Sequence, residues 1–89
     1  MARYEEIELN GERLPILFSM KVVMEFCREK GLKLDDFVQN MESILNDPDS
    51  LELLVWIGFK TGHKLSKKEL TIEKEMVLHV DVNTYAKYI

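Results

Sequence analysis

Few side chains in this sequence are of the types that perform chemistry. The only cysteine, Cys27, falls on the apolar stripe of a predicted helix, where a thiol serves as a small hydrophobic residue. The histidines His63 and His79 are 16 residues apart, and the sequence lacks the H-x-x-x-H, H-E-x-x-H and C-x-x-C spacings that begin metal sites. We expect His63 either at a helix C-terminus, where a partly protonated imidazole favours the helix dipole, or in a plain surface position. The sequence therefore predicts no metal site.

Two adjacent carboxylates, Asp35 and Asp36, come nearest to a catalytic pair. Neighbouring residues on a helix point apart, and acidic residues in a first turn favour the helix dipole, so we expect these aspartates to stabilise a helix start. The sequence has no Gly-rich phosphate loop, no G-x-S-x-G motif and no Ser/His/Asp set with a useful spacing. We therefore predict that the protein is not an enzyme and has no catalytic residue and no cofactor.

The charge distribution favours a protein partner. The formal net charge is −4, and a net-acidic chain is a poor ligand for nucleic acid or an anionic membrane. A local basic segment either forms a docking patch for an acidic partner or for phosphate, or lies on a solvated turn that complements a helix C-terminus. Its lysines are Lys60, Lys64, Lys67 and Lys68. A lone cysteine, with no apolar run of membrane length and no apolar leader, favours the cytoplasm.

A two-residue turn organises the N-terminal segment. Asn10-Gly11 tolerates the positive φ of a type I′ turn, so residues 4–18 are predicted to form a β-hairpin. Its register pairs Ile7 with Leu14 and Glu8 with Arg13. Pro15 is expected on the outer face with the charged residues. The inner, apolar face needs a covering layer and contains Ile7, Leu9, Leu14, Ile16 and Phe18.

Four helices are predicted after the hairpin. Ser19 caps the first and Gly31 ends it, Asp47-Pro48 closes the second, and Gly62 ends the third. Capping patterns also start the third helix at Asp49 with Glu52 and the fourth at Ser66 with Glu69. The expected ranges are 20–30, 34–46, 50–61 and 67–79, with a short helix or turn over 83–89. The predicted fold is α+β: one domain over residues 1–89, with the hairpin packed on a small bundle of about four short helices.

The third predicted helix is apolar on all sides, so it is either central and buried or also faces a partner. Its apolar residues include Leu53 and Trp56. The internal methionines are expected mainly as core filler, with an adaptable Met-lined binding groove as the alternative. They are Met20, Met24, Met41 and Met76.

The features follow one another in a characteristic order. The segment Ile-Glu-Leu-Asn-Gly-Glu-Arg-Leu-Pro-Ile-Leu-Phe-Ser over residues 7–19 leads into a helix that ends at Gly31. Leu-Asp-Asp-Phe, an apolar helix and Leu-Ser-Lys-Lys-Glu-Leu then follow over residues 34–70. Over about residues 7–80, this order resembles the tail assembly chaperones of long-tailed bacteriophages and prophages.

The resemblance implies a non-catalytic protein of the host cell cytoplasm that is absent from the mature virion. Its implied partners are the tape measure protein, the tail tube protein and further copies of itself, and no nucleic acid or membrane. Head-to-tail contacts between copies would join the acidic hairpin to the basic segment. The residues expected to face partners are Glu6, Glu8, Leu53, Trp56, Lys60, Lys64, Lys67 and Lys68. The alternative function is a small protein-binding adaptor or an antitoxin-like regulator from a mobile element.

Overall fold

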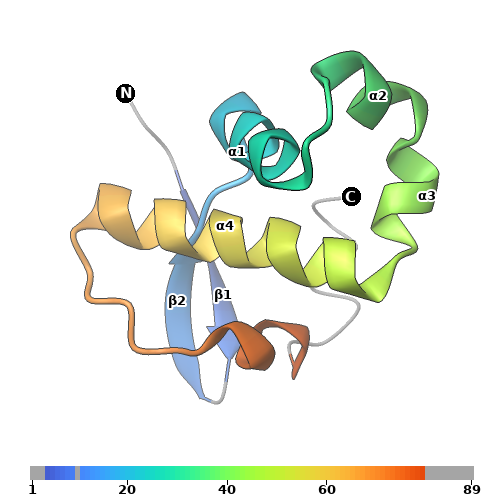
Figure 1. Cartoon of the computed structure of the whole chain (residues 1–89). Coiled ribbons are helices and arrows are strands. Elements are labelled where there is room, and N and C mark those ends of the chain that lie inside the picture. Colours follow the sequence, from blue (N-terminus) through green and yellow to red (C-terminus); the bar gives the residue numbers. More distant parts are fainter. Residues whose placement is uncertain (1–3, 10, 80–89) are drawn as a thin grey trace.

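A computed structural model describes residues 4–9 and 11–79 of the chain (Figure 1). A two-stranded hairpin is followed by four α-helices and a 3₁₀ helix. The elements are β1 (Glu5–Leu9), β2 (Glu12–Ile16), α1 (Met20–Lys30), α2 (Leu34–Gln39), α3 (Met41–Leu45), α4 (Pro48–Ser66) and η1 (Lys74–His79). The predicted α+β class, with a hairpin packed on four helices, is confirmed.

The hairpin has the predicted antiparallel register. Its cross-strand pairs are Glu5–Ile16, Glu6–Pro15, Ile7–Leu14, Glu8–Arg13 and Leu9–Glu12. Gly11 has a φ of +80°, as the second position of a type I′ turn requires, whereas Asn10 lies outside the described residues. The placement of Pro15 on an exposed outer face is wrong. Pro15 is fully buried because α4 packs against this end of β2.

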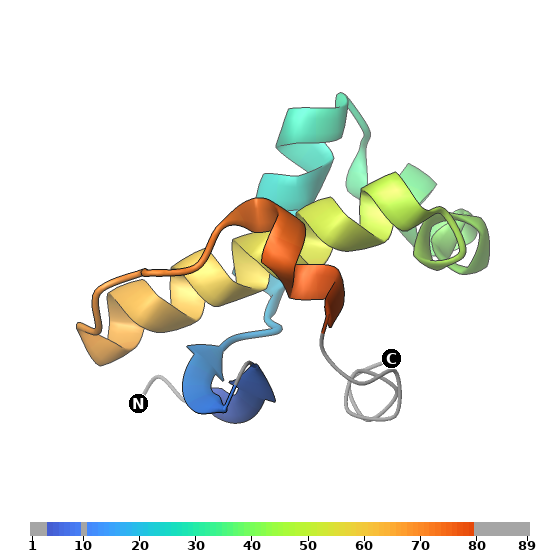
Figure 2. The same ribbon diagram turned by 90° about the horizontal axis from the view of Figure 1, so that it is seen from below.

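Helix α4 is 19 residues long and lies at the centre of the fold. In Figure 1, α1, α2 and α3 lie on one side of α4, and the hairpin and η1 lie on the other. Figure 2 shows η1 running beside α4. Two glycines of α4 face β2 and the residue after it: Leu17 N–H donates to Gly58 O over 3.0 Å, and a Cβ on Gly62 would lie 2.8 Å from Ile16 Cα. The prediction of a central, buried third helix is therefore confirmed.

The predicted helix over 34–46 is two shorter helices. The backbone departs from helical geometry at Asn40, where φ is −113° and ψ is 20°. The Asn40 side-chain amide donates to Asp36 O over 2.9 Å, and this side-chain bond to the backbone competes with continued helix formation. Asp35 and Asp36 do lie in the first turn of α2, and Asp36 Oδ2 accepts a hydrogen bond from Lys33 N–H over 3.3 Å.

The third helix is longer at both ends than the predicted range of 50–61. Its N-cap is Asp47, whose Oδ2 accepts from the Ser50 hydroxyl over 2.7 Å and from the Ser50 N–H over 3.2 Å. The helix then continues through Gly62 and ends at Ser66. Gly62 does not end the helix because its missing side chain serves the close approach of β2.

The predicted fourth helix over 67–79 is wrong in its first half. Lys67 has a φ of +60° and ends α4, and the Ser66 hydroxyl donates to His63 O over 3.2 Å. Ser66 therefore belongs to the end of α4 and does not cap a new helix. Residues 68–73 are irregular, and the 3₁₀ helix η1 begins at Lys74. The turn or helix predicted over 83–89 lies outside the described residues.

Buried apolar side chains form two clusters, one on each side of α4. The hairpin cluster consists of Ile7, Leu9, Leu14, Ile16, Val55, Phe59 and Val77. The helix cluster consists of Val22, Phe26, Cys27, Phe37, Leu54 and Ile57. In the helix cluster, the rings of Phe26 and Phe37 meet edge to face, with their centres 5.7 Å apart. No helix in the described part of the chain has the length and apolar character needed to cross a bilayer.

Candidate protein-binding groove

The two acidic residues predicted to face partners lie on the exposed face of the hairpin. Glu6 and Glu8 are exposed, and Glu6 Oε1 lies 3.9 Å from Arg13 Nε on the neighbouring strand. Both members of this ion pair are exposed, with side-chain exposures of 49% for Glu6 and 68% for Arg13. Such a solvated pair contributes little stability and leaves both side chains accessible.

The basic segment lies next to the hairpin of the same molecule. Lys68 Nζ donates to the backbone oxygen of Arg13 over 3.4 Å. Lys60 Nζ lies 6.0 Å from the centre of the Trp56 ring, and Lys64 and Lys67 are exposed. The structure therefore brings Lys68 to the hairpin, so the acidic and basic surfaces adjoin within one molecule.

The apolar partner residues predicted on the third helix also serve the core. Leu53 is half-buried and packs against the helix cluster, whereas Trp56 is half-buried and packs against the hairpin cluster. The eight predicted residues are thus spread over the hairpin, the middle of α4 and its C-terminal end, and they do not form one hollow.

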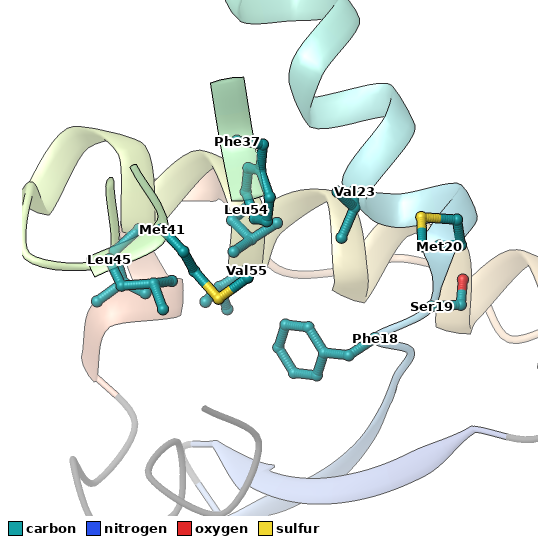
Figure 3. A pocket seen from close by; sticks show the side chains of 10 residues that line it. Phe18, Ser19, Met20, Val23, Phe37, Met41, Leu45, Leu54 and Val55 are labelled. Carbon is teal, nitrogen blue, oxygen red and sulfur yellow. The ribbon is translucent and has the colours of Figure 1, made fainter. Parts of the chain in front are cut away.

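An apolar groove that the sequence did not locate opens between the segment after β2 and helices α1 to α4 (Figure 3). Its volume is about 300 Å³, and its lining residues are Phe18, Ser19, Met20, Val23, Phe37, Met41, Leu45, Leu51, Leu54 and Val55. In Figure 3 the side chains of Phe18 and Met41 project into the same space from opposite sides, with Leu45 beside Met41. Among these lining residues, Ser19 alone has a polar side chain. The groove lacks the convergent polar groups that orient a small molecule and suits apolar side chains of a protein.

Methionines were the sequence feature that could have indicated this groove. Met20, Met24 and Met41 are 60%, 51% and 41% exposed, so the expectation that they fill the core is wrong. Met20 and Met41 line the groove, as in the alternative of a Met-lined binding surface. A flexible thioether side chain adapts its shape to different apolar partners, which suits a binding surface.

The thiol considered for chemistry lies in the helix cluster of the core. Cys27 is buried, and this burial, with a smaller contribution from the Asp36 carboxylate, raises the pKa of its thiol, which disfavours the reactive thiolate. The described side chains include no group of three that could hold a metal ion.

His63 lies in the last turn of α4, as predicted, but the alternative of a plain surface position is wrong. His63 is 2% exposed, and its Nδ1 lies 2.7 Å from Phe59 O, while its Nε2 has no hydrogen-bond partner in the described part of the chain. Its ring lies beside that of the fully buried Phe59, with the two ring centres 6.2 Å apart.

Comparisons with protein-family models, with curated proteins and with solved structures find no match to this chain. The groove is therefore the feature from which a binding function is inferred.

Proposed function

We propose that this protein is a non-catalytic tail assembly chaperone of a long-tailed phage. It binds the tape measure protein and helps to recruit tail tube subunits in the cytoplasm of the host cell, and it is absent from the mature virion. The order of motifs over residues 7–80 supports the family, and the groove supports protein binding as the activity.

The observation that carries this proposal is the uncovered apolar surface around the groove. Met20 and Met41 line the groove and stay largely in contact with water, and Val38, on the neighbouring helix α2, is 59% exposed. A grouped apolar surface of this kind marks a protein interaction site. A chaperone that coats a long protein meets many different segments, and methionine side chains accommodate such variety.

Co-expression with the tape measure protein of the same phage tests the proposal. We expect the wild-type chain to keep a tape measure fragment in the soluble fraction and to copurify with it. Met41→Gln is expected to reduce both effects, because it places an amide in the apolar groove. Leu65→Gln is the matched control, since Leu65 lies near the end of α4, is not a lining residue and is 40% exposed, against 41% for Met41.

Two outcomes would contradict the proposal. If the wild-type chain neither copurifies with the tape measure protein nor changes its solubility, the chaperone function is wrong. If Met41→Gln and Leu65→Gln bind as well as the wild type, the groove is not the binding surface.

A further inference from the structure

We infer that the groove binds an amphipathic helix whose apolar stripe is flanked by lysine or arginine. This inference rests on the proposed function and specifies the chemistry of the partner segment. It follows from the kind of walls that the groove has and from the charges beside them.

The walls favour a helix over an extended strand. A β-strand that binds by strand addition needs backbone donors and acceptors from its binding site, as at the edge of a sheet. Except for Phe18 and Ser19, every lining residue of this groove lies on a helix, and the backbone groups within a helix are already paired with one another. A bound helix pairs its own backbone groups and offers a stripe of apolar side chains, so it can fill the groove without leaving polar groups unpaired.

Two glutamates occupy equivalent positions beside the groove. Glu42 follows the lining residue Met41 and precedes the lining residue Leu45 by three positions. Glu52 follows Leu51 and precedes Val55 in the same way. Residues three apart on a helix are surface neighbours, so each carboxylate lies beside the apolar lining of its own helix. A helix seated in the groove would therefore have a carboxylate beside it on both α3 and α4.

The segment that carries this wall has acidic residues and no basic ones. No lysine or arginine occurs between Lys33 and Lys60, a stretch that contains α2, α3 and the first half of α4. The acidic residues of this stretch are Asp35, Asp36, Glu42, Asp47, Asp49 and Glu52. Helix α1, on the opposite wall, carries both signs of charge, and Lys21 is its nearest basic residue to the lining position Met20. The groove is thus complementary to a basic partner and repels an acidic one.

A pair of designed peptides tests the inference on the full chain. Both are 20-residue helices with the same leucine stripe, and the positions that flank the stripe are lysine in one and glutamate in the other. We expect the lysine peptide to bind at least about tenfold more tightly than the glutamate peptide at low ionic strength, because several exposed charge pairs are exchanged for like-charge contacts. The difference should shrink as salt is added. Fluorescence anisotropy of labelled peptides gives both affinities.

Variants that replace glutamate with glutamine show which carboxylates cause the difference in affinity between the two peptides. Glu42→Gln with Glu52→Gln should weaken lysine-peptide binding by about threefold to tenfold and leave glutamate-peptide binding equal or tighter. The matched control, Glu5→Gln with Glu12→Gln, removes the same charge from the hairpin and should leave both affinities unchanged. Asp36 and Asp47 are left intact because each accepts a hydrogen bond at a helix start.

Three results would overturn the inference: equal affinity for the two peptides, equal loss in the two double variants, or self-association through the groove that the lysine peptide cannot displace. In the last case the occupant is a second copy of this chain, and sedimentation velocity would show the oligomer. Failure here with successful tape measure copurification would leave the proposed function standing. Lysine-peptide binding without tape measure binding would support the preference of the groove for a basic helix and contradict the proposed function.

Discussion

The two sides of α4 bury residues of similar kinds, but they leave different amounts of apolar surface uncovered. On the hairpin side, Ile16 and Phe59 are fully buried, and Gly62 brings the helix backbone against the strand. On the side of α1 to α3, Phe26 and Ile57 are equally buried, yet an apolar groove of about 300 Å³ remains open above Leu54 and its neighbours.

This difference separates the region that holds the fold together from the region for which we propose a binding function. A close contact between helix and strand backbones leaves no room for a partner, whereas short helices such as α2 and α3 cannot cover the whole of an apolar helix face. Met20 and Met41 then line a surface that only a partner can cover. The hairpin side also has a hollow of about 360 Å³, between the hairpin and residues 71–76, but its lining includes Glu12, Thr71 and Glu73. The structure thus combines a close helix–strand contact on the hairpin side with an open apolar groove on the helix side, and each prediction below tests that contrast.

The largest effect is expected from truncating a buried aromatic residue on the hairpin side. Phe59→Ala should lower the free energy of unfolding by about 3–5 kcal/mol, because it removes buried apolar area and leaves a cavity. Met41→Ala, on the helix side, should cost less than about 1 kcal/mol, because Met41 is already 41% exposed. Urea unfolding followed by circular dichroism measures both. Equal costs would mean that the groove is as well packed as the hairpin side.

The next effect concerns the contact between helix and strand backbones. Alanine in place of glycine inside a helix ordinarily stabilises it by about 0.5–1 kcal/mol. Gly62→Ala should instead destabilise the protein by about 1–3 kcal/mol, because the new Cβ would lie 2.8 Å from backbone atoms of Pro15 and Ile16. Lys64→Ala, an exposed position on the same helix, is the control and should change stability by less than about 0.5 kcal/mol. A stabilising Gly62→Ala would show that α4 can move away from β2 at little cost.

Local sequence chemistry predicted the hairpin register and the first helix well. The Asn10-Gly11 turn sets which strand residues face each other, and Gly31 adopts the left-handed conformation, with φ of +70°, that ends α1. Both features depend on a few adjacent residues. For that reason they are visible without knowledge of the tertiary structure.

Features that depend on tertiary contacts were missed. The sequence predicts a helix end at Gly62, because a glycine that stops a helix and one that admits a neighbouring strand look the same in sequence. The burial of His63 depends on the tertiary structure as well. Exposure of Met20 and Met41 was also missed, since an apolar residue at helical spacing normally faces a core. The groove itself depends on how α2 and α3 separate at Asn40 and pack on α4, which no local pattern encodes.

Two adjacent valines of α1 allow a direct comparison of open and closed packing. Val22 is fully buried in the helix cluster, and Val23 lines the groove. Val22→Leu should destabilise the protein by about 1 kcal/mol or more, because a well-packed core resists an added methylene. Val23→Leu should be neutral or stabilise by up to about 0.8 kcal/mol, because the new methylene has space in the groove. Because the same substitution is made at both positions, the difference in helix propensity between valine and leucine cancels in the comparison. Equal losses of stability in the two variants would mean that the groove is closed in solution.

The smallest effect is expected at the start of α4, which positions Leu51 and Leu54 beneath the groove. The Asp47 carboxylate accepts hydrogen bonds from the Ser50 hydroxyl and N–H, and the hydroxyl bond is the main cause that lowers the pKa of Asp47. Asp47→Ala should lower the melting temperature by a few degrees at pH 7, because the first turn loses its cap. Asp47→Asn keeps an acceptor oxygen and should lower the melting temperature less than Asp47→Ala does.

The pH dependence distinguishes the ionised cap from a general effect of the substitution. A carboxylate whose pKa is lower in the folded state stabilises that state fully above its ordinary pKa of about 4. That stabilisation is lost as the pH falls through the lowered value. The difference in melting temperature between wild type and Asp47→Asn should therefore be constant from pH 7 to about pH 5 and shrink below about pH 4. A difference that persists unchanged at pH 2 would show that the contribution of the Asp47 cap to the stability of the helix start does not depend on the charge of Asp47.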